Sequence, residues 1–350
     1  MPIKSRIFVF IMFKYKINGK ENEESTTVEE QISKMISRGV VIADTKKAEE
    51  YLLDIGYYRL GFYLHPFEVT YPELGKKRRH RVNANTRIED AVALYYFDFD
   101  LRNILNRYLS RIEVAIRTTM IYELSNKYNY NPVWFVDPAV VSTPFVTDFP
   151  NKVYKTIKDK EVIKRHHRRY PTDIYAPAWK TMEFMVFGNL TTLYNSLLLN
   201  DDRRLVSQRY GVAQTNVFFD HIEAVRLVRN ACAHGNVLFD FNLYTSVNNG
   251  PAGRFTGTTR HNLGVALEVI KFLLKTVSSN RCDELEHDLI KAAQALYEKC
   301  PSLEPLIEAK TGIKVPASAK QTKIPDATRR KIRKIHKKLA HILATINNNT

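Results

Sequence analysis

Apolar positions along the chain recur at helical spacing and predict a mostly helical protein. The longest run begins at Thr86 and continues to about Tyr128 without an interrupting Gly or Pro. Thr86-Arg-Ile-Glu89 matches a capping box, in which a threonine hydroxyl and a glutamate carboxylate each bind a backbone N–H of the first turn. We therefore expect one long helix here, and a helix of this length usually forms the backbone of an all-α domain.

Shorter patterns before and after this helix predict the rest of the fold. Thr27-Val-Glu-Glu30 is another capping box, and Asp44 is placed to cap a helix that ends near Gly56. A polar, glycine-containing loop is expected at residues 244–260. The remaining expected helices cover residues 152–169, 179–198, 215–233, 263–277, 283–298 and a last basic segment near 329–346.

These elements divide the chain into four expected parts. Residues 1–26 form an N-terminal extension, either a short strand or a docked segment, and residues 27–85 form an N-terminal helical segment. Residues 86–280 form the helical core. Residues 281–350 form a C-terminal helical region that is rich in lysine and arginine. No internal repeat is visible.

Composition favours a cytoplasmic protein. Hydrophobic residues make up 44% of the chain, but no apolar run approaches the roughly 18–20 residues that span a bilayer. The apolar run at residues 7–13 is cut short by Lys14, and no small-residue cleavage site follows. Cysteines are few, far apart and without a C-x-x-C pair, which suits a reducing compartment. They are Cys232, Cys282 and Cys300.

The net charge of +16 points to a polyanionic partner, above all nucleic acid. Membrane surfaces and acidic proteins are the alternatives. Each basic cluster could contact RNA phosphates or form a solvated surface, and the last could also lie on anionic lipid or dock its apolar face on the core. The candidate RNA-binding residues are Lys76, Lys77, Arg78, Arg79, Arg81, Lys164, Arg165, Arg168, Arg169, Arg329, Arg330, Lys331, Arg333 and Lys334.

Candidate chemistry lies in the segment Val228-Arg-Asn-Ala-Cys-Ala-His-Gly235, at a predicted helix end. RNA carries its own nucleophile, the 2′-hydroxyl, so a histidine that moves protons and an arginine that binds the phosphate suffice without a metal. His234 would be the acid–base residue, Arg229 would bind the phosphate, and Asn230 would orient one of the two. The alternative is structural: His234 caps the helix, and Arg229 pairs with Glu223 or Glu113.

Other residues allow a functional and a plain structural interpretation. Glu113 and Arg117 stand at i,i+4 spacing, so they form an intrahelical ion pair or a support that holds the motif. Asp98 and Arg102 have the same spacing. The aromatic segment at 57–67 belongs to the core or stacks bases.

Four blocks in order resemble the Abi family, the AbiD/AbiF-like abortive-infection proteins. Together they cover about residues 27–240. After His234, however, the chain continues with Gly235 where the family has a bulky or basic residue. The blocks are Ile55-Gly-Tyr-Tyr-Arg-Leu60 with Pro66-Phe67; Leu94-Tyr-Tyr-Phe-Asp98 with Leu101-Arg102 and Ile112 to Arg117; Pro177-Ala-Trp179 with Glu183 and Phe187-Gly188; and Val228 to His234.

The resemblance implies a HEPN-like helical bundle within the core at residues 86–280, because the second half of the Abi family resembles HEPN domains. Arg229 and His234 match the Arg-x4-His residues of HEPN domains, and Asn230 matches the polar second position. HEPN nucleases generally build one site from two facing motifs, and this chain has one such motif. The resemblance therefore implies a homodimer.

The function that follows is a phage-defence toxin that binds RNA and cleaves it as a metal-independent endoribonuclease, without a cofactor, and leaves 2′,3′-cyclic phosphate ends. Two alternatives remain open. The protein could hold a structured non-coding RNA without cutting it, or it could be a HEPN protein-interaction subunit whose positive charge recognises an acidic partner.

Overall fold

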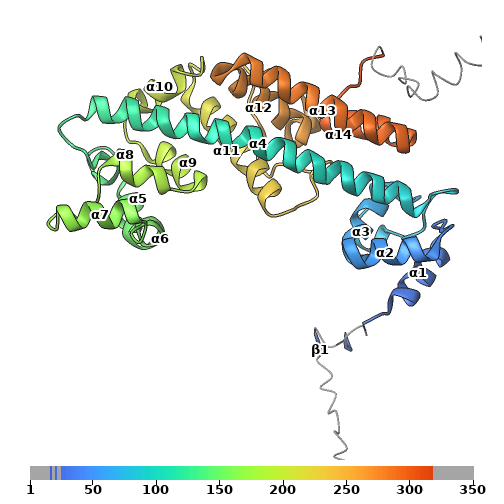
Figure 1. The fold of residues 1–350 in the computed structure, drawn as a ribbon. Helices are drawn as coiled ribbons and strands as arrows, with labels where there is room; N and C mark the ends of the chain where they lie inside the picture. The colour runs from blue at the N-terminus through green and yellow to red at the C-terminus, as the bar shows by residue number, and fades with distance from the viewer. Residues whose placement is uncertain (1–15, 18–19, 22–24, 318–350) are drawn as a thin grey trace, which may run out of the picture. The chain divides into compact units, whose positions relative to one another are not determined.

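The predicted all-α fold is confirmed. A computed structural model describes residues 16–17, 20–21 and 25–317, and helices dominate it (Figure 1). Within the described residues, strands occur as one antiparallel pair, β1 (Lys16–Ile17) and β2 (Lys20–Glu21). The basic segment near 329–346, with five of the candidate RNA-binding residues, lies outside the described residues.

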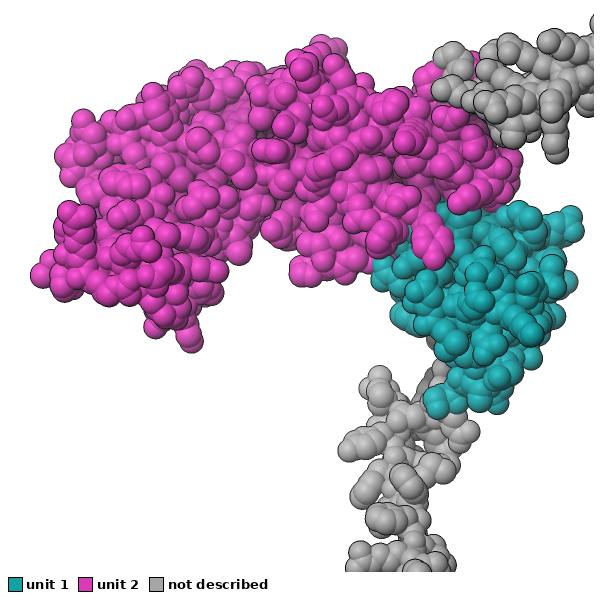
Figure 2. Space-filling view, viewed as in Figure 1, with its two compact units in different colours: residues 1–95 teal, residues 96–350 magenta. Residues whose placement is uncertain are grey.

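The chain forms two compact units, residues 1–95 and residues 96–350 (Figure 2). Unit 1 contains three short helices, α1 (Val28–Ser37), α2 (Thr45–Ile55) and α3 (Tyr57–Leu64). They are followed by the 3-10 turns η1 (His65–Phe67) and η2 (Gly75–Lys77).

Local capping explains where the helices of unit 1 begin and end. Both hydrogen bonds of the predicted capping box between Thr27 and Glu30 are present at the start of α1. The carboxylate of Asp44 accepts a hydrogen bond from the backbone N–H of Lys47, as expected for the N-cap of α2. Gly56 separates α2 from α3 at φ +86°, a backbone conformation that favours glycine.

The long helix is α4 (Ile88–Lys127), with 40 residues. The predicted capping box of Thr86 and Glu89 is wrong. The hydroxyl of Thr86 instead donates to the carbonyl of Asn83, and the backbone N–H of Arg87 donates to the carboxylate of Asp90. The start of α4 is displaced because the backbone on both sides of Arg87 forms a parallel bridge to Val41.

The rest of unit 2 consists of shorter helices that follow α4 in the chain. They are η3 (Trp134–Val136), α5 (Thr143–Asp148), the π-helical η4 (Phe149–Tyr154), α6 (Lys155–Ile157), α7 (Glu161–Arg169), α8 (Ala178–Thr181), η5 (Met182–Phe184), α9 (Phe187–Ser196), α10 (Asn200–Gln208), α11 (Thr215–Ala233), η6 (Gly257–His261), α12 (Leu263–Val277), α13 (Ser279–Lys299), η7 (Pro301–Leu303) and α14 (Glu304–Thr311).

Two predicted helices are interrupted in the structure. Residues 152–169 break at Lys160, whose backbone is extended before α7. Residues 179–198 break at Met185, which is extended between η5 and α9 and whose carbonyl accepts a hydrogen bond from Arg117 at 2.9 Å. The helical pattern does not reveal this break, and the side chain that binds the freed carbonyl comes from another helix.

The core of unit 2 forms around α11 and α12. Helix α11 packs against α9, α10 and α12, and α12 also packs against α13 and α14. Side chains of α4 from Leu101 to Leu124 contribute a continuous apolar face, since Leu105, Leu109 and Met120 are fully buried. This packing fixes α11, which carries the Arg-x4-His motif. Within the described residues, no helix is both long and apolar enough to cross a membrane.

Candidate nucleic-acid site at the end of helix α11

Helix α11 ends in the motif, and its end has a defined geometry. The helix stops at Ala233, and His234 is its C-cap. Gly235 has φ +67°, its N–H donates to the carbonyl of Cys232, and the N–H of Asn236 donates to the carbonyl of Ala231. These two bonds are those of a Schellman motif, whose left-handed position is occupied here by Gly235.

Arg229 lies in an ion-pair network with residues of α4. Its Nε is 3.4 Å from Oε2 of Glu113, and its side chain remains 35% exposed. Oε1 of the same carboxylate accepts a hydrogen bond from Nη2 of Arg117 at 2.9 Å. Glu113 and Arg117 therefore form the intrahelical pair and also support the motif. One carboxylate lies between two guanidinium groups, so the network keeps a net positive charge.

Arg117 extends the network to a third segment of the chain. The side chain is buried, and its Nη2 also donates to the carbonyl of Met185. Helix α4 thereby joins the motif to the segment between η5 and α9. The role of this carbonyl could not be predicted from the sequence, because every residue has a backbone acceptor and residue type gives no signal for it.

The other two motif residues are placed differently. Asn230 Oδ1 lies 3.5 Å from Nη1 of Arg229, a long contact, and within the described residues the Asn230 side chain makes no hydrogen bond to His234. His234 is exposed at the helix end. At about 100° per residue, positions 229 and 234 lie roughly 140° apart around the helix axis. On an ideal helix the two side chains would therefore lie on different faces.

A buried ion pair holds the segment that follows the motif. The fully buried carboxylate of Asp98 accepts hydrogen bonds from the backbone N–H groups of Leu238 and Phe239, at 2.9 and 2.6 Å. Arg102 pairs with Asp98 and donates to the carbonyl of Asn236 at 3.1 Å. The i,i+4 spacing of Asp98 and Arg102 indicated the pair, but only the fold shows that it anchors the exit from α11.

Two further side chains of α11 are explained by their neighbours. Arg226 pairs with Glu223 at 2.7 Å and donates to the hydroxyl of Tyr244, so Glu223 already has a partner, nearly two turns before Arg229. Burial raises the pKa of the Cys232 thiol to about 12, although the charge of Arg102 lowers it and the charge of Asp98 offsets only part of that effect. Cys232 is therefore a small buried side chain.

The first basic cluster, in unit 1, is partly engaged. Arg78 forms a two-point ion pair with the buried carboxylate of Glu68. Lys77, Arg79 and Arg81 are exposed. One of the predicted phosphate-binding arginines is thus held within the fold, and the others remain at the surface.

The second basic cluster, on α7 of unit 2, stays largely in solvent. Lys164, Arg165 and Arg168 have side chains that are 48%, 75% and 63% exposed. Their acidic partners are exposed as well, and such surface pairs contribute little. Arg169 lies over the ring of Tyr170. The cluster can therefore still attract a polyanion.

Comparison with known families adds one match, to the family described as Abi-like protein, over residues 50–240. The chain belongs to this family. The matched region begins in α2 and ends directly after the backbone groups that Asp98 holds, so it contains both the motif and its supports. Membership in the Abi-like family associates the chain with abortive infection, a defence against phage. No curated protein and no solved structure matches the chain.

Proposed function

We propose that this Abi-like protein is a HEPN-type endoribonuclease that acts as a phage-defence toxin and needs no metal. The observation that carries the proposal is the end of α11, where Arg229 and His234 remain accessible while ion pairs and a Schellman motif fix the backbone around them. A rigid frame with exposed reactive groups is what positional catalysis requires.

The proposed reaction is an internal transfer within RNA. The 2′-oxygen attacks the adjacent phosphorus, and His234 takes the proton from the 2′-hydroxyl. The bond from phosphorus to the 5′-oxygen breaks, and a protonated histidine donates a proton to this leaving oxygen. Arg229 stabilises the charge that develops on the phosphate oxygens. The products are a 2′,3′-cyclic phosphate and a 5′-hydroxyl, so no water and no oxidant is consumed.

A two-fold homodimer would complete the site. Arg229 and His234 diverge by roughly 140° on one helix, so one copy supplies them poorly to the same phosphate. Two motifs that face each other across a two-fold axis would offer one histidine as base and the other as acid.

A second candidate function is the binding of a structured non-coding RNA without cleavage. The ion pair between Glu113 and Arg229 favours it, because a paired arginine binds a phosphate less strongly than a free one. In this case the exposed cations of α7 and of residues 77–81 would hold the RNA, and the motif would have a structural role.

The deciding experiment compares wild-type protein with His234→Ala on labelled RNA in excess chelator. Cleavage by the wild type alone, with cyclic phosphate ends, supports the nuclease. His287→Ala serves as the matched control, because His287 is another exposed histidine, on α13. If wild type and His234→Ala both retain the same co-purified RNA and neither cuts, the second candidate is favoured. Full activity of a strictly monomeric preparation would contradict the shared site.

A further inference from the structure

The aromatic segment at residues 57–67 divides between the core and the surface of unit 1. Leu60 and Tyr63 are fully buried, whereas Tyr58 is 81% exposed and Phe62 is 41% exposed. The two exposed rings stand one turn apart on α3 and meet edge to face, with centroids 5.2 Å apart. Packing in the core explains why Leu60 and Tyr63 are apolar or aromatic. It does not explain the two exposed rings, Tyr58 and Phe62.

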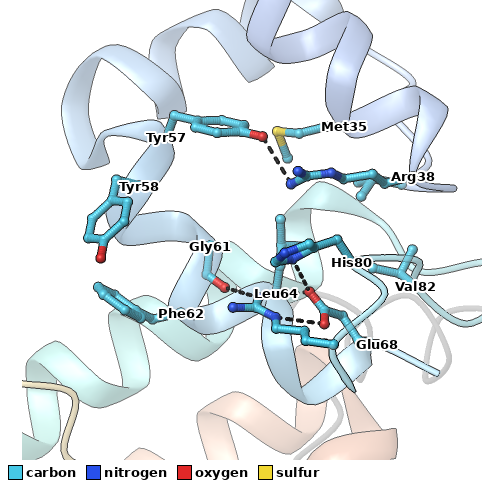
Figure 3. Close-up of a pocket in the computed structure, with 12 residues that line it drawn as sticks. Met35, Arg38, Tyr57, Tyr58, Gly61, Phe62, Leu64, Glu68, His80 and Val82 are labelled. Carbon is cyan, nitrogen blue, oxygen red and sulfur yellow. Dashed lines mark hydrogen bonds and ion pairs between the residues drawn. The ribbon is translucent and has the colours of Figure 1, made fainter. Parts of the chain in front are cut away.

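These two rings stand beside a cavity of about 170 Å³ that lies entirely within unit 1 (Figure 3). Apolar side chains from three segments line it, among them Met35, Leu64 and Val82. Pockets for drug-sized ligands hold roughly 300–1,000 Å³. The cavity therefore suits one flat ring system better than a whole cofactor.

A fixed pair of charges forms one wall of the cavity. Arg78 binds both oxygens of Glu68, through Nε at 2.8 Å and Nη2 at 2.7 Å, and Nδ1 of His80 lies 3.4 Å from the same carboxylate. Burial by itself raises the pKa of Glu68. The hydrogen bond and charge of Arg78, together with the charges of His80 and His65, lower it by more, so the pKa of Glu68 is below its usual value. Glu68 stays ionised and holds Arg78 in place.

The opposite wall adds a second guanidinium. Nη1 of Arg38 donates to the hydroxyl of Tyr57 at 3.0 Å, and both residues line the cavity. Two arginines and one carboxylate thus line the cavity, and the exposed cations of residues 77, 79 and 81 lie on the same segment as Arg78. A ligand that fits these walls combines a flat ring with a negative charge, which is the chemistry of a nucleotide.

We propose that this cavity binds one unstacked base of a single-stranded RNA, with Tyr58 and Phe62 against the base and Arg38 and the exposed cations near residue 79 on the flanking phosphates. The proposal rests on the RNA partner of the proposed function but not on cleavage. A free nucleotide also combines a flat ring with a negative charge. The test therefore compares binding of RNA with binding of free nucleotides.

The test uses the full chain carrying His234→Ala, so that the RNA stays intact. A labelled mixed-sequence RNA of about 20 nucleotides is titrated by fluorescence anisotropy, and AMP, GMP, CMP and UMP are titrated separately by calorimetry. Tyr58→Ala is compared with Tyr130→Ala, since Tyr130 is 78% exposed and does not line the cavity. We expect Tyr58→Ala to weaken RNA binding about 5- to 150-fold, which converts from ~1–3 kcal/mol per stacked base.

A second readout distinguishes stacking from charge. Loss of a stacked base leaves the slope of log K against log salt unchanged, whereas loss of a phosphate contact reduces it by about 0.7 for a single strand. Tyr58→Ala should keep the slope, and Arg79→Ala should reduce it. Photo-crosslinking with 4-thiouridine RNA should label Tyr58 or Phe62.

The outcomes separate this proposal from the nuclease proposal. RNA binding that depends on Tyr58, with no cleavage by the wild type, supports the cavity and contradicts the nuclease. Nucleotide binding that depends on Tyr58, without RNA binding, supports the nucleotide chemistry and overturns the RNA source. Equal RNA and nucleotide binding by Tyr58→Ala and Tyr130→Ala overturns the proposal, and so do crosslinks confined to other segments.

Discussion

The carboxylate of Glu113 on α4 lies 3.4 Å from Nε of Arg229 on α11, and the same carboxylate binds Arg117. The contact holds the Arg229 guanidinium near α4, and the side chain is still 35% exposed. With two arginines sharing one glutamate, the cluster retains a positive charge that a phosphate can neutralise. The contact therefore positions Arg229 and leaves part of its charge available.

Replacing this glutamate tests whether it positions Arg229 for reaction. Glu113→Gln keeps the size of the side chain and removes the charge that attracts Arg229, so the guanidinium is held less firmly beside α4. On the proposed nuclease, we expect the single-turnover rate to fall by about tenfold or more, equivalent to ~1.4 kcal/mol, with little change in RNA affinity. Glu123→Gln is the control, because Glu123 lies on α4 like Glu113 and also pairs with an arginine, Arg209, at the end of α10. Equal rates for both variants would contradict a positioning role.

Asp98 is expected to be essential for the stability of unit 2. Asp98→Asn removes the charge that pairs with Arg102 and replaces an acceptor with a donor opposite two backbone N–H groups. Breaking a buried pair costs about 3–5 kcal/mol, so the free energy of unfolding in urea should fall by roughly that amount. Asp288→Asn, at an ion pair with exposed Arg107, should cost no more than about 1 kcal/mol. Equal losses for the two variants would disprove the anchoring role.

Apolar periodicity and capping residues predicted the helices whose bounds depend on residues nearby in the sequence. Helices α11 and α12 have the predicted bounds, because their apolar faces are visible in sequence. The breaks at Lys160 and Met185 could not be predicted, and the carbonyl of Met185 binds Arg117, which lies 68 residues away in the sequence. The motif was found from residue types, while the anchor of Leu238 and Phe239 depends on backbone N–H groups that every residue shares.

The thiol of Cys232 should be chemically inert despite its place in the motif. Burial raises its pKa from 9.0 to about 12, so its thiolate fraction near neutral pH falls about 1,000-fold. Iodoacetamide should label Cys232 in the folded protein far more slowly than in protein unfolded in urea, as followed by mass spectrometry. Rapid labelling of the folded protein would show that the helix end opens in solution.

His221 should make the protein sensitive to acid. It is fully buried, both ring nitrogens are without a hydrogen-bond partner in the described structure, and burial lowers its pKa from 6.5 to about 4. Between these two values the unfolded chain binds the proton and the folded chain does not, so the free energy of unfolding falls as the pH drops from 6.5 to 4. The full loss is about 3 kcal/mol.

The acid sensitivity is measured as a difference between two proteins. His221→Leu has an apolar side chain that does not titrate, so its urea unfolding should lack this part of the pH dependence while the carboxylates contribute equally to both proteins. The advantage of wild type over the variant should therefore shrink by about 3 kcal/mol between pH 6.5 and 4. Parallel pH profiles would mean that His221 gains a partner or solvent that the structure does not show.

The basic helix α7 is expected to contribute to RNA affinity through charge alone. Arg165 and Arg168 are well exposed, and their shared partner Glu161 is 60% exposed, so water already screens these pairs. Changing both arginines to alanine should reduce the slope of log K against log salt by about 0.7–0.9 for each lost phosphate contact, and weaken binding to all RNA sequences alike. Changing Arg107 and Arg209, which pair with carboxylates elsewhere in unit 2, serves as a control of equal charge loss. An identical slope for the two double variants would show that net charge, and not a phosphate-binding surface on α7, determines the affinity.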